Sequence, residues 1–118
     1  MNKRKVGGRY EEAAALWLQK KGCRLLEKNF RIRSGEIDLI MEDGSTIVFV
    51  EVKFRGGKGY GSGEEHVGRR KQERIIRVAR YFLLRYGLSD RYCRFDVISI
   101  DGQGRITHYE NAFEITQE

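Results

Sequence analysis

The sequence predicts an α/β domain in which two helices flank a mixed sheet, in the order αβββαββ. Three observations support this. The chain has 118 residues, of which 40% are hydrophobic, so it can bury one core. Two segments have the spacing of amphipathic helices, and several short apolar runs are bounded by turn residues. We therefore expect a single domain over residues 1–118.

The first helix is expected at residues 10–18. Apolar side chains recur there at the i, i+3, i+4, i+7 spacing of an amphipathic helix, and Gly22 follows as a stop. Residues 25–30 form a short apolar run that fits a strand. The chain therefore opens with a helix followed by a strand.

Two further strands are predicted at residues 37–41 and 46–54, because both runs are rich in branched and aromatic side chains. The segment 42–45 between them, Glu-Asp-Gly-Ser, has a hairpin signal. Residues 55–63 contain five glycines in nine positions, which predicts a mobile loop. The first three strands are thus expected to form a meander that ends in this loop.

Structure is expected to resume at about Glu65, and a long second helix follows. Its apolar face is marked by residues between Ile75 and Tyr86, its other face carries arginines from Arg69 to Arg85, and Gly87 is its stop. A strand is predicted at 94–100, a turn at 101–104 and a last strand at 105–109. This completes the αβββαββ order.

Composition excludes several classes of protein. The net charge is +6 and the sequence pI is near 9.5, in a chain too apolar to be disordered. No apolar run approaches the ~20 residues that cross a bilayer, and the charged residues 1–5 are not followed by an apolar stretch, so we expect a cytoplasmic protein. Cys23 and Cys93 lack nearby metal-ligand partners and are expected to be small buried apolar residues.

The strand at 46–54 carries two charges, Glu51 and Lys53, in an otherwise apolar run. A strand that is apolar on both faces is normally central, so these charges lie at the margin of a core. A buried ion is usually matched by an opposite charge, a metal or a substrate. Two interpretations follow: a purely structural Glu51–Lys53 pair on one face, or a functional site.

Asp38 on the preceding strand favours the functional site. A two-residue loop of Asp43 and Gly44 would set Asp38 opposite Phe49, with Glu51 its diagonal neighbour within ~7–8 Å, and a four-residue loop would set the two carboxylates directly opposite. Two carboxylates at such a separation repel each other unless a cation lies between them, and oxygen ligands suit Mg²⁺ or Mn²⁺. The pattern predicts a divalent-metal site for phosphodiester hydrolysis. Asp38 and Glu51 hold the ion, which lowers the pKa of a bound water, and Lys53 steadies the water or the phosphate.

Four segments of the chain occur together in a fixed order: GEIDLI at 35–40, VFVEVKFR at 48–55, RFDVI at 94–98 and NAF at 111–113. In these segments the sequence resembles a known family, the YraN-like bacterial proteins. This family is predicted to be nucleases, and it is similar to the archaeal Holliday junction resolvases and the restriction-endonuclease-like superfamily.

The resemblance implies a restriction-endonuclease-like core and a set of site residues. The superfamily's Asp, then Glu-x-Lys pattern falls on Asp38, Glu51 and Lys53, and the backbone carbonyl of Val52 is implied as a further metal ligand. The acidic residue of the first helix falls best on Glu11. Glu12 remains an alternative.

Other residues have weaker assignments. The resemblance implies that Lys71 or Gln72 on the second helix reaches the site, although both also fit a solvated basic face. Asp96 with Arg94 is explained equally by a buried ion pair and by catalysis. His66 has no assigned role and fits a solvated loop residue.

The basic residues around the site indicate a nucleic-acid partner, because phosphates attract clustered lysines and arginines. Tyr60 in the glycine-rich loop could stack on a base. The residues expected to bind nucleic acid are Arg33, Arg55, Lys58 and Lys71.

The predicted function is a metal-dependent endonuclease that hydrolyses DNA, with branched and single-stranded DNA among its candidate substrates and Mg²⁺ or Mn²⁺ as cofactor. The alternative is a non-catalytic nucleic-acid-binding domain that retains the nuclease fold. A third class, a structural interaction domain, predicts no salt-sensitive nucleic-acid binding. A resolvase that cuts two strands symmetrically needs a two-fold axis, so a homodimer is the assembly to test.

Overall fold

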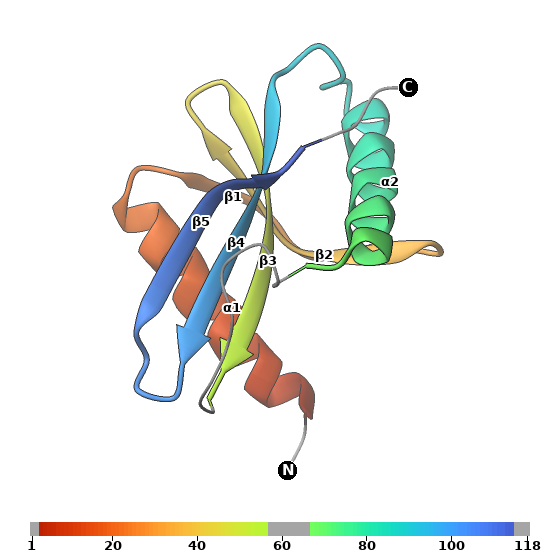
Figure 1. Ribbon diagram of the computed structural model, residues 1–118. Helices are drawn as coiled ribbons and strands as arrows, with labels where there is room; N and C mark the ends of the chain where they lie inside the picture. Colours follow the sequence, from red (N-terminus) through yellow and green to blue (C-terminus); the bar gives the residue numbers. More distant parts are fainter. Residues whose placement is uncertain (1–2, 57–66, 115–118) are drawn as a thin grey trace.

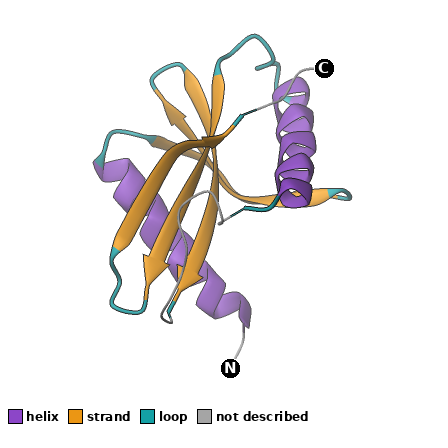
Figure 2. Cartoon of the chain, in the orientation of Figure 1, coloured by secondary structure: helices purple, strands orange, loops and turns teal. Residues whose placement is uncertain are grey.

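The computed structural model describes residues 3–56 and 67–114 and has the predicted αβββαββ order (Figures 1 and 2). Two helices lie against a five-stranded mixed sheet with strand order β1-β2-β3-β4-β5. Neighbouring strands are antiparallel except β3 and β4, which are parallel and are joined across α2. The elements are α1 (Lys3–Lys20), β1 (Arg24–Ile32), β2 (Gly35–Asp43), β3 (Thr46–Arg55), α2 (Arg69–Arg85), β4 (Cys93–Asp101) and β5 (Ile106–Phe113).

β3 is the central strand, as its apolar sequence predicts, and both of its faces are covered. Ile47 and Phe49 pack into the cluster that includes α2, whereas Val48 and Val50 pack into the cluster that includes α1. All four side chains are buried, and burial of each contributes about 1.5–3 kcal/mol. The charged residues that follow on β3 are therefore held on a rigid strand.

α1 begins earlier than the hydrophobic spacing predicts, at Lys3 rather than near Tyr10. Residues 8–9 are exposed, so this part of the helix has no apolar periodicity to reveal it. α2 begins at Arg69, the first arginine of its predicted basic face. The predicted mobile loop falls largely on residues 57–66, which lie outside the described residues.

The hairpin between β2 and β3 differs from the expected two-residue loop of Asp43 and Gly44. The loop is Gly44-Ser45, and Asp43 pairs with Thr46. Gly44 has φ +60°, as the first position of a type II′ turn requires, and this conformation favours glycine. Continuing this register sets Asp38 directly opposite Glu51, which is the arrangement expected for the four-residue loop, instead of opposite Phe49.

The cysteines largely follow expectation. Cys23 is buried and Cys93 is half-buried, both thiols are free, and burial raises the pKa of each. Neither described helix is long and apolar enough to cross a membrane.

Candidate functional site

The site lies where β2 and β3 stop pairing. Their ladder runs from Asp43 and Thr46 to Leu39 and Val50. Beyond it, the backbone N–H of Val52 donates a hydrogen bond to Asp38 Oδ2 at 2.8 Å. The Asp38 carboxylate is thus fixed between the two strands.

Three carboxyl groups from three elements interact at this position. Burial, reinforced by the neighbouring Glu51 carboxylate, raises the pKa of Asp38 to about 8, against the opposing effect of the Val52 hydrogen bond. Burial likewise raises the pKa of Glu11 on α1, and the charge of Glu36 and, to a smaller extent, that of Glu51 add to the effect. Glu11 also interacts with Asp38, whereas Glu12 is exposed. The structure therefore brings Glu11, not Glu12, to Asp38 and Glu51.

Two lysines lie beside these carboxyl groups. Burial and the nearby charge of Lys71 lower the pKa of Lys53, and the charge of Glu51 opposes this. Lys71, near the start of α2, forms an ion pair with Glu51, whose side chain is only 8% exposed. The structural interpretation of a Glu51–Lys53 pair therefore misses the main partner of Glu51. Lys71 is expected from sequence both on a nucleic-acid-binding surface and, through the family resemblance, as one of two residues of the second helix that could reach the site; its ion pair places it at the site.

The other residues considered from sequence are placed as follows. Gln72 stabilises the start of α2, where its Nε2 donates a hydrogen bond to the Val67 carbonyl at 2.9 Å. Arg33 is exposed in the turn after β1, and Arg55 is half-buried at the end of β3. The remaining three, Lys58, Tyr60 and His66, lie outside the described residues.

Asn29 is a site residue that the sequence analysis missed. It lies on β1 between two residues that pair with Leu39 and Ile37, which sets it beside Asp38. Its φ is +52°, and its side chain hydrogen bonds to Glu11, which lowers the pKa of that carboxyl against the effect of burial. Asparagine is uncommon inside strands and tolerates this left-handed conformation. Its presence in a predicted strand was therefore the sequence signal that could have indicated a site residue.

Asp96 belongs to a second, separate polar cluster. Its carboxylate accepts hydrogen bonds from His108 Nε2 at 2.7 Å, the Asn111 backbone at 3.0 Å and Arg94 Nε at 3.1 Å. Burial alone would raise the pKa of Asp96, but these three donors outweigh it and lower the pKa. Because both oxygens have protein partners, the structure favours the ion-pair interpretation of Arg94 and Asp96. His108 was not foreseen in it.

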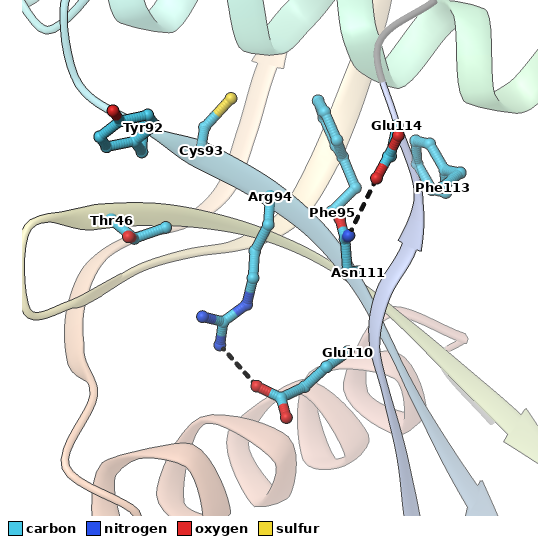
Figure 3. Close-up of a pocket in the computed structure, with 9 residues that line it drawn as sticks. All are labelled: Thr46, Tyr92, Cys93, Arg94, Phe95, Glu110, Asn111, Phe113 and Glu114. Atoms are coloured by element: carbon cyan, nitrogen blue, oxygen red, sulfur yellow. Dashed lines mark hydrogen bonds and ion pairs between the residues drawn. The ribbon is translucent and has the colours of Figure 1, made fainter.

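A pocket of about 560 Å³ lies at the opposite end of β3 (Figure 3). Thr46 lines it, and at ~3.3 Å per residue this position is roughly 17 Å along the strand from Glu51. Arg94 also lines the pocket, and its guanidinium forms ion pairs with Glu110 at 3.3 Å, with Asp43 at 3.1 Å and with Asp96. None of the predicted catalytic residues lines this pocket.

Within residues 3–56 and 67–114, no three Asp, Glu, His or Cys side chains are arranged closely enough to hold a metal ion. Glu11, Asp38 and Glu51 are thus electrostatic neighbours in this arrangement, with Lys71 drawn to one of them.

A family model described as "Uncharacterised protein family UPF0102" matches residues 10–100, which include Glu11, Asp38, Glu51 and Lys53. The chain belongs to the UPF0102 family. This confirms the YraN-like resemblance.

UPF0102 proteins from several bacteria match most of the chain. The protein from Pelotomaculum thermopropionicum is 47% identical over 93% of this chain and 97% of its own length. Those from Persephonella marina and Stutzerimonas stutzeri are 45% and 44% identical, over 89% and 97% of this chain and 90% and 99% of their own lengths. Among solved structures, Pyrococcus furiosus SfsA in complex with Ca²⁺ is 14% identical with a TM-score of 0.38, over 95% of this chain and 65% of that chain. This structural likeness is weak.

Proposed function

We propose that this UPF0102 protein is a metal-dependent endonuclease with a restriction-endonuclease-like core, which hydrolyses phosphodiester bonds in DNA. The observation that carries the proposal is the meeting of Glu11, Asp38 and Glu51, from α1, β2 and β3, beside Lys53. Like charges gathered in a partly buried site destabilise the fold unless a cation or a proton compensates them. Such an arrangement is typical of functional sites.

The chemistry of the donor atoms, rather than the present spacing of the side chains, fits a hard divalent ion. Asp38 and Glu51 supply carboxylate oxygens, the Val52 carbonyl is a further oxygen donor, and Glu11 lies close enough to interact with Asp38. Oxygen donors of this kind suit Mg²⁺ or Mn²⁺. When bound, the ion would supply Lewis-acid activation of water and positive charge for the phosphate.

The chain's own residues have distinct tasks in this proposal. Lys53 steadies the attacking water or the charged phosphate through its ammonium group. The Val52 N–H holds the Asp38 carboxylate in place and so fixes the site to the β3 backbone. Asn29, through its hydrogen bond to Glu11, orients the carboxyl group that comes from α1.

One observation favours a second candidate, a nucleic-acid-binding domain without hydrolytic activity. Lys71 neutralises Glu51 through an ion pair, so this carboxylate is compensated without a metal. In the enzyme, Lys71 must exchange this contact for the phosphate or for solvent when the ion binds. In the binding domain, it stays on Glu51.

The test incubates purified protein with Mg²⁺ or Mn²⁺ and with linear, nicked, flapped and four-way DNA. We expect metal-dependent cleavage that EDTA stops and that Asp38→Asn and Glu51→Gln abolish. Asp90→Asn, which changes an exposed aspartate in a loop, and Glu12→Gln are matched controls and should cut normally. Wild-type protein that binds DNA but cuts none of the panel would favour the binding domain.

A further inference from the structure

We propose that the outer surface of α2 binds the phosphate backbone of a double-stranded DNA arm beside the site. This inference rests on the proposed function, in which DNA is the substrate. It adds that the bound DNA is double-stranded and that it lies along α2. The surface, called here the arginine face, consists of Arg69, Arg70, Arg74, Arg77 and Arg80.

All five side chains of the arginine face are exposed. None of them forms an ion pair with a carboxylate in the described part of the chain. Glu73 is the one acidic residue among the 17 residues of α2. The face therefore presents dense positive charge that the described fold does not use.

The arginine face destabilises the helix that carries it. Arginines three or four residues apart, such as Arg70 and Arg74 or Arg74 and Arg77, repel one another. Arg69 and Arg70 also lie in the first turn, which has no acidic residue, at the positive end of the helix dipole. A polyanion laid along this face would relieve both effects.

The position of α2 connects this face to the site. Lys71, in its first turn, forms the ion pair with Glu51. From Arg70 to Arg80 the helix rises about 15 Å, which spans about four steps of a DNA strand. In Figure 1, α2 stands at one side of the molecule, on the face of the sheet opposite α1. Phosphates bound along the helix would therefore lead to Glu51.

The chemistry of the face favours a duplex over a single strand. Binding of single strands relies on aromatic side chains on which bases stack. The aromatic residue beside the arginines, Tyr81, has its ring 6.3 Å from that of Phe30 and also interacts with Arg85. What the face offers is phosphate contacts.

A second copy of the chain is a poorer occupant. A two-fold interface through this face would set arginines against arginines, because the same patch meets itself. Charge complementarity therefore selects a polyanion.

The test measures binding of a short fluorescent duplex in EDTA by anisotropy, so that cleavage does not enter. Arg70→Gln/Arg77→Gln removes two charges from the face, and Lys20→Gln/Arg105→Gln removes two exposed charges elsewhere. We expect the α2 variant to lose about tenfold in affinity at moderate salt. Its slope of log K against log salt should fall by about 1 to 2, at about 0.9 per phosphate contact, and the control should stay near wild type. Circular dichroism checks that both variants are folded.

Equal affinity of the α2 variant and wild type, or an equal loss in the control, would overturn the inference. So would a single strand of the same sequence that binds as tightly as the duplex. If wild type cuts DNA while the α2 variant keeps full duplex affinity, the nuclease proposal stands and this inference fails. If duplex affinity depends on Arg70 and Arg77 but nothing is cut, this inference stands and the nuclease proposal fails.

Discussion

Asp38 is the carboxyl group of the candidate site at which burial and neighbouring like charges act together. It is held by the Val52 N–H, faces the Glu51 carboxylate and is reached by Glu11. Burial and these like charges make its ionised form unfavourable in the folded protein. A residue kept at such a cost to the fold is expected to serve binding or chemistry.

The first prediction replaces this charge. Asp38→Asn keeps an oxygen that can accept from Val52 and removes the repulsion, so it should raise the stability of the metal-free protein by about 1 kcal/mol or more, roughly 4–8 °C in Tm. Because the pKa of Asp38 is raised in the fold, wild-type stability falls as pH rises from about 4 toward 8. The gain from Asn should therefore grow over this range. Thermal unfolding in EDTA measures it, and a variant less stable than wild type at every pH would contradict the account.

Asp96 shows the opposite behaviour, because its carboxylate is fully satisfied. Asp96→Asn breaks the buried pair with Arg94 and should cost about 3 kcal/mol near neutral pH. The pKa of Asp96 is lowered in the fold, so its contribution is present above the ordinary pKa near 4 and is lost as pH falls through the lowered value. The difference between variant and wild type in urea unfolding should shrink in acid. A constant difference down to the lowest pH would exclude this role.

At the scale of elements, the β2–β3 turn sets the register of the site. Gly44→Ala should cost about 1 kcal/mol because φ +60° strains a side chain there, although the space around the new Cβ is open. Gly8→Ala is the matched control, since Gly8 lies inside α1 with nothing within 4 Å of its added Cβ. It should stabilise the protein by about 0.5–1 kcal/mol. Equal effects of the two substitutions on Tm would contradict the turn geometry.

Sequence patterns predicted the elements that bury apolar surface. The central position of β3 followed from its two apolar faces, and both helices were found from their apolar stripes. The early start of α1 could not be predicted, because exposed basic residues have no hydrophobic period. Asp43-Gly44 and Gly44-Ser45 are both acceptable two-residue turns, so the sequence could not choose between the registers.

Within the site, the acidic residues were easier to predict than their partners. Asp38 and Glu51 stand out as charges in apolar strands, and Glu11 came from family resemblance. The contact of Lys71 with Glu51 depends on how α2 packs across the sheet, and that of Asn29 with Glu11 on a local backbone distortion of β1. Neither is encoded in residue spacing.

Across the whole molecule, the proposed metal ligands lie on the sheet, whereas the arginine face lies on α2. Metal binding and DNA binding are therefore expected to be separable. Lys53→Ala should leave metal-induced stabilisation largely intact and reduce cleavage at least tenfold, because its proposed contacts are with water and phosphate. Parallel thermal-shift and cleavage assays test this. Loss of the metal response in Lys53→Ala would show that the lysine supports the metal site itself.

The most direct test of the central claim is a Mn²⁺ titration followed by thermal unfolding of wild type, Asp38→Asn and the control Asp90→Asn. An ion that binds only the folded protein stabilises it by mass action, by about 2.7 kcal/mol at a hundredfold excess over Kd. We predict a concentration-dependent rise in Tm for wild type and Asp90→Asn, and none for Asp38→Asn. A wild-type Tm that does not respond to Mn²⁺, or an equal response in Asp38→Asn, would contradict the assignment of Asp38 and Glu51 as a metal site.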